Sequence, residues 1–221
     1  MTQMNDINVN SAVVPAPVID MQGDGRWNSQ HRIFCEQGQN KDVDILVLGD
    51  SMCRLMYNSS AWSNLKPYRC LNFGIGGDKT QNILWRLQNG ELDSVTARYV
   101  VIWCGTNNVD NSASEIAEGV NAVINYVRQK LNCFVLMLGI APRGERPNPL
   151  RSKMEEANSI IKRNIQDMSK VSYLDVGNQF LGENGILSNL DFYDFLHPTP
   201  MCYEKILSAI LKQIEAFESS S

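Results

Sequence analysis

A serine at the end of an apolar run is the first residue of this sequence that is placed to do chemistry. The run Ile45–Met56 (ILVLGDSMCRLM) breaks at Gly49, Asp50 and Ser51. Gly49 permits a sharp turn, and Ser51 falls where a helix should begin, beside backbone N–H groups that stabilise a negative oxygen. The alternative is a simple helix N-cap, since Asp and Ser are both favoured there. The two interpretations are compatible.

A serine hydroxyl is a weak nucleophile and needs an adjacent base. The chain has two histidines, His31 and His197. His31, near Trp27, is predicted to be structural. His197 lies in the segment 191–199 (DFYDFLHPT), three residues after Asp194. A carboxylate at that spacing can orient the imidazole and stabilise its charged form, as a serine triad requires. The alternative is an exposed histidine near an acidic residue.

Two further loops carry groups suited to binding an oxyanion. Asn72–Lys79 (NFGIGGDK) has three glycines within four positions, including Gly77, and is not followed by the Gly-Lys-Ser/Thr sequence of a phosphate-binding loop. A tight turn with a helix cap at Asp78 is the structural alternative. Gly105–Val109 (GTNNV) follows an apolar run, and the Asn107 amide could donate to an oxyanion, although asparagine is common in turns.

Elements that would position these loops alternate along the chain. Apolar runs predict strands buried on both faces, and the stretches between them have helical spacing. The strands are predicted over residues 43–49, 68–74, 98–105, 132–140 and 171–177, and the helices over 80–87, 113–130, 150–169 and 203–217. This alternation predicts an α/β fold with a mainly parallel sheet and helices on both faces. Ligands of such sheets bind at the carboxyl ends of the strands, where the loops above lie.

Composition limits the class of protein. The 221 residues are 43% hydrophobic and 20% charged with a net charge of −4, which fits a globular protein and argues against nucleic acid as the main partner. We predict a partly flexible N-terminal tail over residues 1–24 and one domain over 25–221. No signal peptide or membrane span is expected. The six scattered cysteines are predicted to be buried thiols of a cytoplasmic protein.

Together these blocks resemble the GDSL, or SGNH, hydrolases. The residues that carry the resemblance are Gly49-Asp50-Ser51, Gly77, Asn107 and the Asp194-x-x-His197 pair. Longer blocks closely resemble the catalytic alpha subunits of intracellular type I platelet-activating-factor acetylhydrolase, from about residue 27 to about 217. They are LNFGIGGDKTQNILWRLQNGEL (71–92), GTNNVDNSA (105–113), PRGERPNPLR (142–151) and DFYDFLH (191–197).

The resemblance implies a five-stranded, flavodoxin-like, three-layer α/β/α sandwich and a serine esterase. Ser51 would be the nucleophile, His197 the general base and acid, and Asp194 the residue that orients His197. The oxyanion hole would consist of the Ser51 and Gly77 backbone N–H groups and the Asn107 side chain. The implied reaction removes a short sn-2 acyl group, such as acetyl, from an ether phospholipid such as platelet-activating factor.

Acyl selectivity in the family comes from side chains around the nucleophile. By position these are Met52, Thr106 and Leu196, and their bulk would leave room for a short acyl chain only. Met52 stands where the superfamily motif has leucine, which is a near-isosteric change. The resemblance implies no metal and no cofactor. It also implies a cytosolic protein that forms a homo- or heterodimer with a similar alpha subunit and binds a WD-repeat lissencephaly-type regulatory protein.

Three other functions compete with this one. The chain could be a non-catalytic or dual-role subunit whose main task is binding the WD-repeat partner, although its triad positions are filled. It could be an SGNH esterase for another small ester, such as a lysophospholipid or an acetylated sugar. A flavodoxin-like nucleotide binder would share the sheet but would leave the Asp-x-x-His pair and the asparagine loop unexplained.

Overall fold

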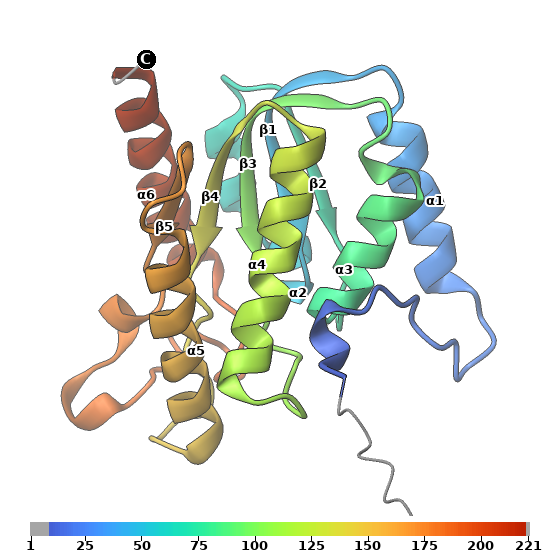
Figure 1. The fold of residues 1–221 in the computed structure, drawn as a ribbon. Helices are drawn as coiled ribbons and strands as arrows, with labels where there is room; N and C mark the ends of the chain where they lie inside the picture. Colours follow the sequence, from blue (N-terminus) through green and yellow to red (C-terminus); the bar gives the residue numbers. More distant parts are fainter. Residues whose placement is uncertain (1–8, 220–221) are drawn as a thin grey trace, which may run out of the picture.

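Five parallel strands form one sheet in the order β2-β1-β3-β4-β5 in the computed structural model, which describes residues 9–219 (Figure 1). The strands are Asp42–Gly49 (β1), Cys70–Gly74 (β2), Thr96–Trp103 (β3), Phe134–Leu138 (β4) and Val171–Leu174 (β5). The central strands β1 and β3 are buried on both faces, as their continuous apolar runs predict.

Helices cover both faces of the sheet. They are Arg26–Gly38 (α1), Ser51–Asn58 (α2), Thr80–Arg86 (α3), Ala113–Lys130 (α4), Pro149–Ile165 (α5) and Pro200–Ser219 (α6). Short helical turns are Ser11–Val13 (η1), Ser60–Leu65 (η2), Leu87–Glu91 (η3), Asn178–Phe180 (η4) and Glu183–Gly185 (η5).

Alternate residues of each strand point into two separate cores. Leu46 and Leu48 of β1 pack with α1, α3, α4 and α5, while Ile45 and Val47 pack with α2, η2 and α6. The predicted α/β/α sandwich with a parallel sheet is therefore confirmed, and it is built from period-two alternation within each strand.

Helix α1 was missed by the sequence analysis, because its N-cap residue is Gly25, which offers no side-chain cap, and it buries only Trp27, Phe34 and Gly38. The structural alternative of a helix cap at Asp78 does not hold: Lys79 is the N-cap residue of α3, and the Asp78 carboxylate turns into the core instead.

The segment before α1 lies along α3 and α4 where it is described. Ala12 is fully buried, its carbonyl accepts a hydrogen bond from Thr80 Oγ1 at 2.8 Å, and Asn82 Nδ2 donates to the Ala16 carbonyl at 2.9 Å. Residues 1–8 of the predicted tail lie outside the described residues. The predicted boundary between tail and domain at residue 24 stays a prediction.

All six cysteines are free thiols. Cys53, Cys104, Cys133 and Cys202 are buried as predicted, whereas Cys35 and Cys70 are half-buried. Among residues 9–219, no helix is both long and apolar enough to cross a membrane.

Candidate active site

Ser51 is the first residue of α2, directly after β1. Asp50 caps the helix, accepting a hydrogen bond from the Met52 N–H at 2.9 Å. The Ser51 N–H is therefore one of the helix amides without an intrahelical acceptor. Gly49 makes the turn possible, since a Cβ there would come within 2.1 Å of the Trp103 carbonyl oxygen. The end of β1 and the start of α2 thus fix Ser51 at the carboxyl end of the sheet.

His197 reaches Ser51 from a loop before α6. Its Nε2 lies 3.0 Å from Ser51 Oγ, and its Nδ1 lies 2.7 Å from Asp194 Oδ2. The other Asp194 oxygen accepts hydrogen bonds from the N–H groups of His197 (2.7 Å) and Leu196 (3.1 Å). Partial burial acts to raise the pKa of Asp194, but its hydrogen bonds with His197 outweigh burial and hold the pKa below its ordinary value.

Backbone hydrogen bonds close this loop on itself. The Tyr193 N–H donates to the His197 carbonyl at 3.0 Å, the Thr199 N–H donates to the Asp191 carbonyl at 2.7 Å, and Phe192 forms an antiparallel bridge with Pro198. The Tyr193 ring also stacks on His197, with 5.9 Å between centroids. These hydrogen bonds within the loop are supplemented by the Gly144 N–H, which donates to the Phe195 carbonyl at 2.8 Å, and by Phe192, which is buried in the core.

The glycine loop approaches Ser51, and the asparagine loop is bonded to the glycine loop. A Cβ on Gly76 would lie 3.8 Å from Ser51 Cβ, and Gly77 has a φ of +86°. Asn107 Nδ2 donates to the Asp78 carbonyl at 3.0 Å. Because an amide nitrogen carries two hydrogens, this bond orients Asn107 and leaves one donor over.

Asn108 holds the asparagine loop against α3. It is fully buried, its Oδ1 accepts from the Thr80 N–H at 3.0 Å, and its Nδ2 donates to Gln81 and Asn111. The neighbouring asparagines therefore differ: Asn108 is saturated by structural hydrogen bonds, whereas Asn107 has a donor left for a ligand.

A buried ion network that the sequence analysis missed underlies the glycine loop. The Asp78 carboxylate accepts from Trp27 Nε1 at 2.7 Å and from Arg86 Nε at 2.8 Å, and Arg86 Nη1 binds Glu91. The Arg86 and Asp78 side chains are fully buried, as is that of Glu91. Burial alone would lower the pKa of Arg86, but the Glu91 and Asp78 carboxylates raise that pKa by more than burial lowers it. The guanidinium therefore stays charged.

Arg86 also binds the two strand ends that carry the loops. Its Nη2 donates to the Phe73 carbonyl at 3.0 Å and is 3.4 Å from the Gly49 carbonyl. One buried side chain thereby connects the turn before Ser51, the start of the glycine loop, and Asp78, whose carbonyl orients Asn107.

His31 closes this network at the surface of α1. Its Nδ1 lies 2.9 Å from Glu91 Oε1, and its ring packs against Trp27 and Trp85. The prediction that His31 is structural agrees with these contacts.

Asp50, beside the nucleophile, is a buried carboxyl whose Oδ2 lacks a partner among the described residues. Burial raises its pKa to about 7, and the Asp78 carboxylate adds to the shift, while Arg143 opposes it. Cys53, two residues after Ser51, is fully buried, and burial raises its pKa well above the ordinary value. This thiol is therefore inert at neutral pH.

The three predicted acyl-pocket residues differ in burial. Met52 is packed into the core on the α6 side, and Thr106 is buried with its Oγ1 unpartnered among the described residues. Leu196 is half-buried in the loop that carries His197. The Thr106 carbonyl accepts a hydrogen bond from Arg143 Nη1 at 2.9 Å.

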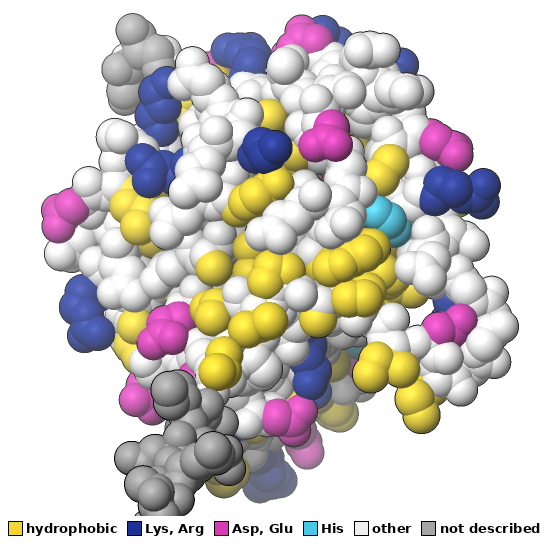
Figure 2. Space-filling model, turned by 45° about the vertical axis from the view of Figure 1, so that its right-hand side comes forward, with side chains coloured by type: hydrophobic (Ala, Val, Ile, Leu, Met, Phe, Trp, Pro, Cys, Tyr) yellow, Lys and Arg dark blue, Asp and Glu magenta, His cyan; other side chains and the backbone are white. Residues whose placement is uncertain are grey.

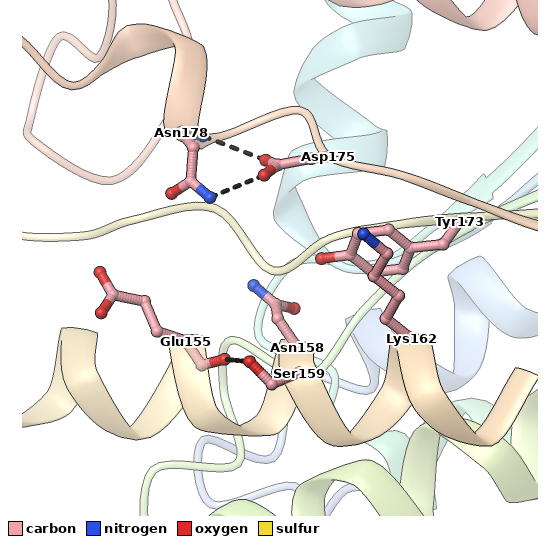
Figure 3. Close-up of a pocket in the computed structure, with 7 residues that line it drawn as sticks. All are labelled: Glu155, Asn158, Ser159, Lys162, Tyr173, Asp175 and Asn178. Carbon is pink, nitrogen blue, oxygen red and sulfur yellow. Dashed lines mark hydrogen bonds between the residues drawn. The ribbon is translucent and has the colours of Figure 1, made fainter. Parts of the chain in front are cut away.

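A separate polar cavity of about 590 Å³ lies between α5 and β5 (Figure 3). Its lining residues are Glu155, Asn158, Ser159, Lys162, Tyr173, Asp175 and Asn178. Asn158 is bonded to the Ile140 backbone, and Asp175 accepts from Asn178, so these polar groups already have partners. None of these seven residues belongs to the loops around Ser51. Within residues 9–219, no group of three or more His, Cys, Asp or Glu is placed to hold a metal ion.

Comparison with known proteins places the chain in a family. Residues 47–205 match the model of the GDSL-like lipase/acylhydrolase family. The chain is 41% identical over 205 residues to rat platelet-activating factor acetylhydrolase IB subunit alpha2, covering 92% of this chain and 90% of that one. It is 38% identical over 203 residues to the rat alpha1 subunit, covering 91% and 88%.

Solved structures agree at the level of the fold. A putative acylhydrolase from Bacteroides fragilis superposes with a TM-score of 0.73 at 17% identity, covering 90% of this chain and 99% of that one. A putative platelet activating factor protein from Streptococcus pneumonia gives 0.72 at 18% identity, covering 84% and 91%. The chain therefore belongs to the GDSL-like lipase/acylhydrolase family and is an ester hydrolase related to the alpha subunits of platelet-activating factor acetylhydrolase IB.

Proposed function

We propose that this ester hydrolase removes a short sn-2 acyl group, acetyl above all, from platelet-activating factor and related ether phospholipids. The observation that carries the proposal is the continuous hydrogen-bonded chain from Ser51 Oγ through His197 to Asp194. The names of the relatives supply the substrate class.

In the first half of the reaction, Ser51 Oγ attacks the ester carbonyl carbon while its proton moves to His197 Nε2. Asp194, which stays ionised because its pKa is lowered, keeps the Nδ1 proton of His197 in place and stabilises the imidazolium. The tetrahedral intermediate then collapses. His197 returns its proton to the departing alcohol oxygen, and the acyl group remains on Ser51 as an ester.

In the second half, water replaces the alcohol. His197 takes a proton from water as it attacks the acyl-serine carbonyl, then returns that proton to Ser51 Oγ when the carboxylic acid leaves. The negative oxygen of both intermediates is assigned to the Ser51 and Gly77 N–H groups and to the free Asn107 donor. Each such donor is worth roughly 3 kcal/mol in the transition state.

The test is hydrolysis of p-nitrophenyl esters, from acetate to octanoate, by the purified protein and its Ser51→Ala variant. We expect activity that falls steeply with acyl length and vanishes in the variant. Lack of activity above the variant on every ester would reject the proposal and favour the binding-subunit alternative.

Acyl selectivity is assigned to Met52, Thr106 and Leu196. Support comes from their places in the chain next to Ser51, Asn107 and His197, and from the burial of Met52 and Thr106. The Met52→Ala, Leu196→Ala double variant should gain activity on butyrate and hexanoate relative to acetate. An unchanged chain-length profile in a folded double variant would contradict the assignment.

A second role as a subunit in a larger assembly is favoured by the relatives, which are named as subunits, and by exposed apolar side chains. Hydrophobic side chains form a band across the face shown in Figure 2. Near the N-terminus, Ile19 and Met21 are 80% and 87% exposed. We place the protein in the cytoplasm, as a dimer with itself or a similar subunit that binds a WD-repeat regulator. Sedimentation equilibrium would test the dimer; a monomer at micromolar concentration would contradict it.

A further inference from the structure

A cleft lies beside the glycine loop, whose Gly76 lies close to Ser51. It has a volume of about 440 Å³ and is lined by Ile75, Gly76 and Gly77 on one side and by Trp27, Gln30 and Arg54 among others. A second cavity of about 270 Å³ shares Gln30 and Arg54 with it. Arg54 therefore lines two neighbouring cavities, one of which also has Gly76 and Gly77 of the glycine loop in its wall.

Arg54 is held close to Ser51 by helix geometry. It lies three residues later on α2, so both side chains leave the same side of the helix. A Cβ on Gly76 would lie 3.8 Å from Ser51 Cβ and 4.0 Å from Arg54 Nη1. Ser51 Cβ and this guanidinium nitrogen are therefore less than about 8 Å apart.

The charge around Arg54 suits an anion. Neither set of lining residues contains an aspartate or a glutamate, and Arg26 adds a second positive charge to the larger cleft. The nearest acidic partner of Arg26 is Asp24, at 3.6 Å on the exposed surface. A guanidinium without a carboxylate in its cleft is suited to a phosphate group, which it binds through two parallel N–H donors.

The spacing matches one arm of a glycerophospholipid. Five covalent bonds of about 1.5 Å each separate the sn-2 ester carbon from the phosphorus atom, so the two lie roughly 6 Å apart when extended. An ester carbonyl at Ser51 would thus bring the phosphodiester to the Arg54 guanidinium, with the glycine loop between them.

We propose that Arg54 is a specificity-determining residue that binds the phosphodiester of the substrate in the cleft beside Gly76 and Gly77. This inference rests on the proposed esterase function of Ser51. It adds a binding site for the phosphodiester, a part of the substrate that the triad does not contact.

The test compares two acetyl esters, one with and one without the phosphocholine headgroup at sn-3. They are a 1-alkyl-2-acetyl-glycerophosphocholine and the 1-alkyl-2-acetylglycerol of the same alkyl length, both below their aggregation limits. In Arg54→Gln, the ratio of kcat/KM for the phosphodiester to that for the neutral ester should fall roughly tenfold, as expected for one charge-assisted hydrogen-bonding group. The fall should shrink at high salt, because the guanidinium is exposed and screened.

Arg163→Gln is the matched control. Arg163 is an exposed arginine of α5 that lines neither cavity, and its loss should leave the ratio unchanged. An unchanged ratio in Arg54→Gln, or an equal fall in both variants, would overturn the inference. If the wild type hydrolyses both esters with the same kcat/KM, the cleft assignment fails while the esterase stands. If it hydrolyses neither, the proposed function itself fails.

Inhibition of p-nitrophenyl acetate hydrolysis separates the sources of phosphate. Competition by glycerophosphocholine in the wild type, weakened in Arg54→Gln, would support binding of the substrate phosphodiester. Competition by inorganic phosphate alone would assign the cleft to free phosphate and overturn the substrate assignment.

Discussion

Two loops meet at Ser51, and different forces hold them. The base loop, residues 191–199, places Asp194 and His197 through hydrogen bonds within itself, and the Asp194 side chain is 42% exposed. The glycine loop, residues 74–79, rests on the fully buried pair of Asp78 and Arg86. The proposed proton-transfer groups thus lie on a partly exposed loop, whereas the loop that carries Gly77 is tied to a fully buried ion pair.

This contrast follows from what each side must do. A histidine that takes and returns protons needs a carboxylate nearby and access to solvent. Oxyanion donors must already point at the oxygen before the reaction, since preorganisation is the source of their effect. Changes in the base loop should therefore alter activity with little effect on stability, and changes beneath the glycine loop should alter both.

The largest effect is expected from Asp194→Asn. Loss of the carboxylate leaves His197 in the wrong tautomer, and kcat should fall about 10⁴-fold. The free energy of unfolding should change little, because the oxygen of the introduced amide can still accept from the two backbone N–H groups. Asp175→Asn is the control: Asp175 makes the same kind of turn, accepting from the N–H groups of Gly177 and Asn178, away from Ser51. A similar loss of kcat in both variants would contradict the account.

Arg86→Met tests the other side. It leaves two buried carboxylates without their cation, and the free energy of unfolding should fall by about 3–5 kcal/mol, measured by urea denaturation. Arg69→Gln is the comparison, because Arg69 also pairs with two carboxylates, Asp42 and Asp44, but at the exposed surface. Its loss should cost much less. Equal losses would remove the distinction between the buried network and a surface ion pair.

Asn107→Ala should lower kcat by about 10²–10³, with KM nearly unchanged, if its free donor binds the oxyanion. Asn108→Ala, one residue away, should instead lower the unfolding midpoint, because it removes the hydrogen bonds that attach the loop to α3. Loss of stability without loss of kcat in Asn107→Ala would reassign that residue to structure.

The smallest effect is expected at Asp50, the N-cap residue of α2 directly before Ser51. Its pKa is raised to about 7 in the folded chain, so the folded state binds one more proton than the unfolded state between about pH 4 and 7. This stabilisation is complete below the unfolded pKa and is lost as the pH rises through 7, with a slope of at most about 1.4 kcal/mol per pH unit. Asp50→Asn keeps a good helix cap and should remove that slope. An identical pH profile of stability in the variant would contradict a buried protonated Asp50.

The same contrast explains how much of the site the sequence predicted. Asp194 and His197 are three residues apart on one loop, so their contact follows from local geometry. The helical spacing over 113–130 likewise predicted the bounds of α4, which the structure has at Ala113–Lys130. Its start is well defined because Ser112 and Glu115 form a capping box there.

The network beneath the glycine loop was missed because its parts are far apart in the chain. Trp27 and Asp78 are 51 residues apart, and a charged residue such as Arg86 within a helix is usually solvent-exposed. The end of the helix predicted over 150–169 was also placed too late, since α5 ends at Ile165. The signal that could have found the network is an arginine at the end of α3 among buried positions, with Ile83 and Leu84 before it and Leu87 directly after it.

The central claim is that Ser51 is a nucleophile activated by His197. The most direct measurement is labelling with a fluorophosphonate, followed by peptide mass spectrometry of the wild type, Ser51→Ala and His197→Ala. The account predicts one phosphonylated residue, Ser51, with no label in Ser51→Ala and much slower labelling in His197→Ala. Labelling of another serine, or an equal rate without the histidine, would contradict it.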